Sequence, residues 1–176
     1  MATYDKYYKD ENYFGNPYPE LINFFSEYPQ RGKLVDLGAG QGRDSVPLSN
    51  MGYEVTSVDI SDVGLDQIRL KDKKISIFFS DVYSYDISDF DFILLDSMLH
   101  FYKNDFEKES KWVQKILSEM KKDALFINCL LKSAKAEKAL LNIIQKHDCE
   151  FEILENKYID YAEANCKYHF LVIKKI

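Results

Sequence analysis

The sequence predicts an α/β protein with a doubly wound, mostly parallel sheet of seven strands and helices on both faces. From Lys33 onward, short apolar stretches typical of strands alternate with longer stretches whose apolar residues recur at helical spacing. Parallel strands need crossover helices of this kind. The last two predicted strands are close in sequence and are expected to form a hairpin, so the last strand is antiparallel.

The elements follow from local patterns taken in order. Pro19 suits a helix start, and the helix that it begins presents Leu21 and Phe25 on an apolar face. A helix is expected from the glycine-rich loop to about Asn50, with Gly52 just beyond its end. The predicted strands are Lys33–Leu37, Glu54–Ile60, Ile75–Phe79, Phe92–Leu95, Leu125–Leu131, Phe151–Tyr161 and Tyr168–Ile173.

Three further helices are expected at Asp62–Leu70, Asp105–Met120 and Ala134–Lys146. The strand Phe92–Leu95 is apolar throughout, as expected where helices cover both faces of a sheet. The helix that follows it is predicted to bury one apolar face made of Phe106, Val113, Ile116, Leu117 and Met120.

Length and composition favour one domain, residues 1–176, with an N-terminal segment and helix at 1–30 and the sheet at 31–176. The net charge of −6 makes nucleic acid an improbable substrate. No apolar stretch is long enough to cross a membrane, and the N-terminus lacks an apolar signal region. The three cysteines are widely spaced, so we expect a cytoplasmic protein. The sequence does not predict the oligomeric state.

A glycine-rich loop follows the first predicted strand and contains Gly38, Gly40 and Gly42. Such a loop lets a ligand approach bare backbone at the start of a helix, as dinucleotides and S-adenosylmethionine both do. Asp36, at the end of the strand, would repel a dinucleotide pyrophosphate but attract the ammonium and sulfonium of S-adenosylmethionine. The alternative is that Asp36 only caps the turn.

Acidic residues also end the next two predicted strands. Asp59 is placed where a carboxylate accepts hydrogen bonds from a ribose diol, unless it caps the helix near Asp62. Asp81 could accept from an adenine amino group while Ile60 and Val82 pack against the ring. Three acids at three successive strand ends favour a cofactor site.

These residues resemble the class I S-adenosylmethionine-dependent methyltransferases, and more narrowly the tellurite-resistance methyltransferase family. The narrower likeness lies in Lys9–Phe14 (KDENYF), Leu34–Ser45 (LVDLGAGQGRDS) and Met51–Val55 (MGYEV). The resemblance implies a Rossmann-like sheet and S-adenosyl-L-methionine as the cofactor. It places Asp36, Gly38 and Gly40 at the methionine part, Asp59 at the ribose, and Asp81 with Val82 at the adenine.

The resemblance also suggests that the N-terminal segment, with Tyr8 and Tyr13, is a lid over the cofactor, the alternative being a surface cluster of aromatic rings. Arg43 could face the substrate or simply pair with an acid. His100, in the segment after the fourth strand, is a candidate general base or acceptor-orienting group, although a lone histidine among Leu and Phe is more often a packing residue. No metal-binding motif is present.

The sequence therefore predicts a methyltransferase that acts on a small molecule or small anion. One alternative is an NAD(P)-dependent oxidoreductase, which would have to tolerate Asp36 beside a pyrophosphate. The other is a non-catalytic module that binds S-adenosylmethionine without transferring its methyl group.

Overall fold

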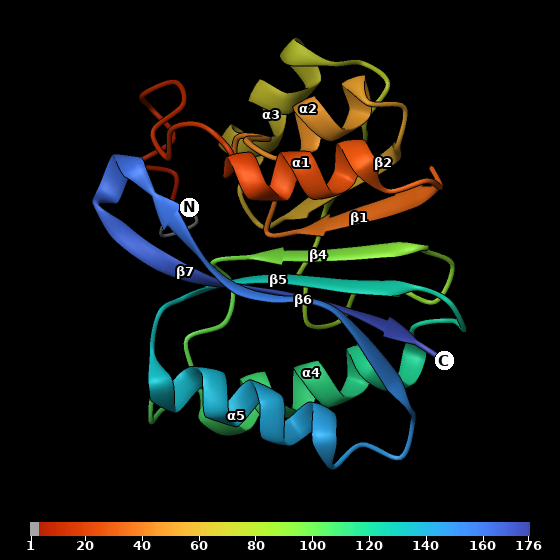
Figure 1. Cartoon of the computed structure of the whole chain (residues 1–176). Coiled ribbons are helices and arrows are strands. Elements are labelled where there is room, and N and C mark those ends of the chain that lie inside the picture. Colours follow the sequence, from red (N-terminus) through yellow and green to blue (C-terminus); the bar gives the residue numbers. More distant parts are fainter. Residues whose placement is uncertain (1–3) are drawn as a thin grey trace. The chain divides into compact units, whose positions relative to one another are not determined.

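The computed structural model describes residues 4–176 (Figure 1). Its strands form a seven-stranded sheet in the order β3-β2-β1-β4-β5-β7-β6, with β7 antiparallel, flanked by helices. This Rossmann-like architecture confirms the predicted fold class. The chain divides into two compact units, the first ending at Tyr85 and the second spanning Asp86–Ile176.

The first unit holds six regular elements: α1 (Pro19–Glu27), β1 (Lys33–Leu37), α2 (Ser45–Asn50), β2 (Glu54–Asp59), α3 (Asp62–Lys71) and β3 (Ser76–Phe79). Its strands are parallel, with Asp36 beside Ser57 and Asp59 beside Phe79. The three helices lie on the same side of β1 and β2 (Figure 1). Leu34, Leu37 and other apolar side chains between the helices and strands are completely buried, so the carboxyl ends of the strands are fixed by a solid core.

The second unit holds β4 (Phe92–Asp96), α4 (Phe106–Glu119), β5 (Leu125–Leu131), α5 (Ala134–Gln145), β6 (Phe151–Tyr161), a short 3-10 turn (Ala162–Ala164) and β7 (Cys166–Lys175). β4 and β5 are parallel, and β7 runs antiparallel between β5 and β6. The predicted hairpin is therefore confirmed. Helices α4 and α5 lie side by side on one side of these strands (Figure 1).

Two details of the predicted helices are wrong. Phe106 was expected in the core but is 42% exposed, because it begins α4 and its ring packs edge-on against Phe101 instead. Trp112 occupies the buried face of that helix. The helix after the glycine loop begins only at Ser45, since the preceding residues form turns. No helix within residues 4–176 combines the length and apolar character that crossing a bilayer requires.

Candidate functional site

The glycine-rich loop is held by main-chain bonds to the neighbouring strand. The amides of Gly38 and Ala39 donate to the carbonyl of Val58, at 2.8 and 3.2 Å. Gly40 has a φ of +53°, a conformation that side-chain-bearing residues rarely adopt. A Cβ at Gly40 would also lie 2.8 Å from the hydroxyl oxygen of Tyr8. The loop therefore presents bare backbone, and the Tyr8 phenol lies directly against it.

A second glycine, Gly64 in α3, lets that helix approach the loop. A Cβ at Gly64 would lie 2.4 Å from the carbonyl oxygen of Gly40. Ser61 caps the same helix, accepting from the Gly64 amide at 3.2 Å. We did not identify Gly64 from the sequence, although a glycine inside a helical pattern is a signal of close packing.

Asp36, at the end of β1, is buried beneath the loop. It accepts a hydrogen bond of 2.6 Å from the hydroxyl of Ser45, which also contacts the hydroxyl of Ser57 at 2.7 Å. Burial and then the nearby carboxyl of Asp44 raise the pKa of Asp36 to about 7, although the bond from Ser45 opposes the shift. Asp36 is therefore a buried carboxyl whose negative charge is incompletely compensated.

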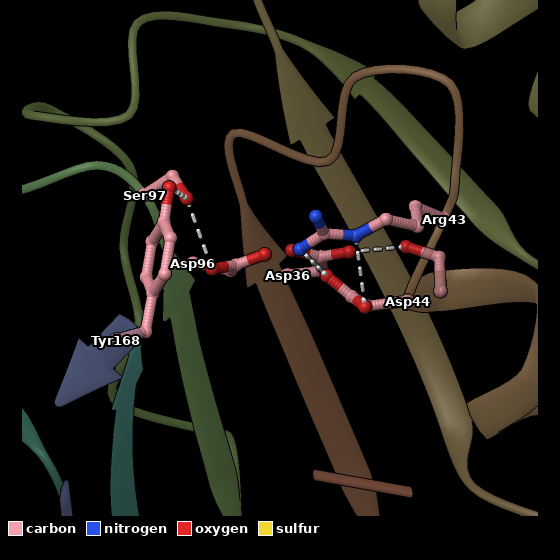
Figure 2. A network of polar contacts seen from close by, with 7 residues as sticks. Asp36, Arg43, Asp44, Asp96, Ser97 and Tyr168 are labelled. Carbon is pink, nitrogen blue, oxygen red and sulfur yellow. Dashed lines mark hydrogen bonds and ion pairs between the residues drawn. The ribbon is translucent and has the colours of Figure 1, made fainter. Parts of the chain in front are cut away.

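Arg43 pairs with the acid next to it in sequence. Its guanidinium contacts Asp44 at 3.1 and 3.3 Å and lies 4.8 Å from the ring centroid of Tyr18. Figure 2 shows Arg43, Asp44 and Asp36 gathered after β1. Burial raises the pKa of Asp44, and Arg43 opposes that shift.

Asp59, at the end of β2, ties the loop to α3. One carboxylate oxygen accepts from the amide of Gly40 at 2.9 Å, and the other from the amide of Ser61 at 2.8 Å. Burial raises the pKa of Asp59, while these backbone bonds lower it. The Ser61 hydroxyl in turn donates to the buried carboxyl of Asp5 at 2.6 Å. Asp5 was missed because no sequence spacing links residue 5 to residue 61.

The remaining residues predicted at the cofactor lie on the turns after β2 and β3. Ile60 is 51% exposed, whereas Val82 is buried. Asp81 is exposed, and its carboxylate accepts from the Tyr83 amide at 3.0 Å. Asp81 thus shapes its own turn while its carboxylate stays open to solvent.

The N-terminal segment is bound to the loop and to α3 through two glutamine side chains. The Gln41 amide nitrogen donates to the carbonyl of Asp10 at 2.8 Å, and its oxygen accepts from the amide of Tyr13 at 3.0 Å. Gln67 donates to the carbonyl of Tyr8 at 2.6 Å. The Tyr8 ring is buried, but the Tyr13 ring is 47% exposed and packs against Tyr7 and Phe14.

In the second unit, His100 lies in a turn that a buried carboxylate holds. Glu109 of α4 accepts from the amides of His100, at 3.0 Å, and Phe101. Phe101 has a φ of +51°. The His100 imidazole stacks on Tyr102 with centroids 5.2 Å apart, and its Nδ1 lies 3.9 Å from Glu109. No sequence signal identifies Glu109 beyond its place in the first turn of a helix. Within residues 4–176 there is no group of three side chains suited to a metal ion.

Comparison with known families finds a match over residues 4–167 to the tellurite resistance protein TehB. The chain belongs to that family. Residues 4–167 include the N-terminal segment, the glycine-rich loop and all the predicted cofactor residues of the first unit. A comparison with curated protein sequences gives no match.

Solved structures with this fold include one TehB protein and several methyltransferases. TehB from Haemophilus influenzae is 21% identical, with a TM-score of 0.73 over 94% of this chain and 67% of that one. The N-methyltransferase NodS from Bradyrhizobium japonicum, in complex with S-adenosyl-L-homocysteine, is 11% identical, with a TM-score of 0.75 over 97% and 95%. The 1,6-didemethyltoxoflavin-N1-methyltransferase of Burkholderia thailandensis is 16% identical, with a TM-score of 0.68 over 89% and 77%.

Family and fold together confirm two predictions made from the sequence. This TehB-family chain is an S-adenosylmethionine-dependent methyltransferase, and S-adenosylmethionine is its cofactor.

Proposed function

We propose that this chain transfers the methyl group of S-adenosylmethionine to a small molecule, and that its first unit holds the cofactor. The observation that carries this proposal is the set of buried carboxyls around the glycine-rich loop, Asp36, Asp44 and Asp59. Burial raises the pKa of each, so the site favours a positively charged ligand that stabilises the ionised carboxylates. S-adenosylmethionine brings two positive groups, an ammonium and a sulfonium.

In this proposal the methionine part of the cofactor lies against Gly38 and Gly40, beside Asp36. The ribose diol donates to Asp59, because a carboxylate has about four lone-pair sites and two backbone amides use only part of that capacity. The adenine lies between the turns after β2 and β3, against Ile60 and Val82, with its amino group on Asp81. Asp81 is suited to this role because its carboxylate is exposed.

The N-terminal segment is proposed to be the lid of this site. Tyr8 lies against Gly40, and Gln41 and Gln67 bind the segment's backbone at three points. The phenol of Tyr8 would contact the bound cofactor, whereas Tyr13 contributes mainly its backbone amide. The Gln41 and Gln67 anchors are neutral hydrogen bonds of modest strength, and the carboxyl of Asp5 adds a further bond from Ser61. Admission of the cofactor requires the segment to open by breaking these bonds.

On the acceptor side, we propose a small-molecule substrate with His100 as an orienting group or base. The net charge of −6 opposes binding to nucleic acid. Methyl transfer needs donor and acceptor in line, so positioning supplies much of the catalysis.

The experiment is calorimetric titration with S-adenosylhomocysteine and with NADH. We expect S-adenosylhomocysteine to bind, and NADH to bind more weakly or not at all. Asp59→Ala should weaken binding by about 10-fold or more, the cost of hydrogen bonds to a charged group. Asp62→Ala, an exposed acid of the same unit, is the matched control and should change little.

A truncated chain lacking residues 1–16 should also bind more weakly while keeping its fold, which circular dichroism would check; unchanged affinity would rule out the lid. Preference for NADH would contradict the cofactor site itself. Tight binding of S-adenosylmethionine without methyl transfer to any acceptor would favour the non-catalytic module.

A further inference from the structure

Strand β3 of the first unit leaves its outer edge open. β3 is the first strand in the sheet order and pairs with β2. Just after it, the amide of Ser80 donates to the carbonyl of Asp59 in β2 at 3.0 Å. Because main-chain groups alternate sides along a strand, those of Ile77 and Phe79 point away from β2. Within residues 4–176 no main-chain hydrogen bond from another segment reaches them, so this edge can accept a further strand.

The side chains along this edge are apolar, and two of them are exposed. Phe79 is 60% exposed and Phe78 is 48% exposed, although the Phe78 ring also contacts Tyr85 with centroids 5.6 Å apart. Ser76–Phe79 contains no charged residue and no proline. Proteins use charge and proline to stop an edge strand from pairing with another chain. β3 lacks both of these protections.

The edge strand of the second unit, β6, is protected in the usual way. Its pairing with β7 has a register shift between Ile153 and Glu155. Its charged side chains are Glu152, Glu155, Lys157 and Asp160. Bulges and charges of this kind prevent edge-to-edge association. The contrast indicates that the open edge of β3 is an interaction surface.

The residues that flank β3 carry opposite charges. Lys73 and Lys74 precede the strand, Asp81 follows it, and all three are exposed. If two copies of β3 ran parallel, the lysines would lie beside lysines. In an antiparallel pair, the lysines of one copy lie beside the acid of the other, which stabilises the pairing. The edge is therefore complementary in charge to itself.

We propose that β3 pairs antiparallel with β3 of a second copy of this chain, giving a two-fold symmetric dimer with a continuous sheet. In such a dimer one residue faces its own counterpart. Ile77 is the central residue whose main-chain groups point outward, so it exchanges both hydrogen bonds with the Ile77 of the second copy. In this register Phe79 lies opposite Ile75, and Asp81 lies opposite Lys73. Because the strand is short, we expect a weak dimer with a Kd of about 10–100 µM.

The test is sedimentation equilibrium of the full chain without cofactor, from about 1 to about 200 µM. We expect the average mass to rise from that of one chain, 20.6 kDa, towards twice that value. A wild-type chain that stays monomeric at about 200 µM would overturn the proposal and leave the edge to a different protein.

Phe79→Pro tests the main-chain pairing, because it removes an amide hydrogen that points to the open edge and not to β2. Phe79→Ala is the matched control, since it also lacks the ring but keeps the amide. Two amides are lost per dimer, so the proline variant should dimerise at least about 10-fold more weakly than the alanine variant. Circular dichroism checks that both are folded. Equal dimerisation of two folded variants would contradict pairing through β3.

Lys73→Glu tests the register and also decides the question if Phe79→Pro does not fold. It places an acid opposite Asp81 and should weaken the dimer several-fold. Combining it with Asp81→Lys restores opposite charges and should restore the wild-type Kd. Lys135→Glu, at an exposed lysine of α5, is the control for the change in net charge. If Lys73→Glu behaved like Lys135→Glu, or if the double variant stayed weak, the proposed pairing would be wrong.

Discussion

The two units bury carboxyl groups in different ways. In the first unit Asp36, Asp44 and Asp59 surround one loop, and burial raises the pKa of each. In the second unit Glu109 is equally buried but accepts two backbone amides of one turn. The first arrangement gathers three carboxyls around one loop, where Asp59 also holds the backbone, whereas the second uses a single carboxylate to hold one turn. Cofactor affinity should therefore depend on the first unit, and acceptor positioning on the second.

The largest effect on stability and on S-adenosylhomocysteine binding is expected from Gly64→Ala. Helix propensity alone predicts that alanine stabilises α3 by up to about 1 kcal/mol. The Cβ would, however, lie 2.4 Å from the Gly40 carbonyl oxygen, so the loop must move. We expect about 2–3 kcal/mol of lost stability in urea unfolding, together with weaker binding of S-adenosylhomocysteine.

Gly52→Ala is the control for this substitution. A Cβ at Gly52 meets nothing within 4 Å, although its φ of +92° still disfavours alanine. It should cost only about 1 kcal/mol and leave cofactor binding unchanged. A stabilised Gly64→Ala protein with normal affinity would show that α3 does not position the loop.

Glu109→Ala, a substitution in the second unit, tests whether cofactor binding and acceptor positioning depend on different units. The change leaves the amides of His100 and Phe101 without their acceptor, at a cost of about 1–3 kcal/mol. We expect slower methyl transfer but unchanged S-adenosylhomocysteine affinity, measured by radiolabel transfer and calorimetry. Equal losses of methyl-transfer rate and of S-adenosylhomocysteine affinity would mean that the two units do not act separately. Glu107→Ala, an exposed acid of the same helix turn paired with Lys111, is the control.

The smallest expected effect is a pH dependence of stability and of S-adenosylhomocysteine affinity, caused by the carboxyl of Asp36. Folding raises its pKa from 3.8 to about 7, so the folded protein keeps a proton that the unfolded chain loses. Its contribution to stability is therefore greatest below about pH 4, falls as pH rises to about 7, and is constant above that. A cation beside Asp36 lowers its pKa again, so binding the cofactor displaces this proton.

Affinity for S-adenosylhomocysteine should thus rise a few-fold, to about 10-fold at most, between about pH 6 and about pH 8. Asp36→Asn should flatten this dependence. Asp44, Arg43 and Asp59 also act electrostatically on Asp36, so some slope will remain. An unchanged slope in the variant would assign the effect to another group. Titration in buffers of different ionisation enthalpy would measure the released proton directly.

Much of the fold and of the glycine-rich loop was predictable because the signals are local. The spacing of apolar residues gave every strand to within a few residues, and the short loop before Cys166 gave the hairpin. Gly38, Gly40 and the acids at the strand ends stand out because β1 and β2 are each followed at once by their loops. The positive φ angles of Gly38 and Gly40 explain why glycine occurs at these positions.

The tertiary structure alone decided the contacts between residues far apart in the chain. Asp5 reaches Ser61, Gln67 reaches Tyr8, and Tyr168 reaches Ser97 across 56, 59 and 71 residues. Each such side chain is chemically ordinary, and its role depends on which strand or loop the fold brings beside it. Sequence periodicity specifies which face of an element is buried, whereas the partner of a polar group is fixed only when the elements have packed.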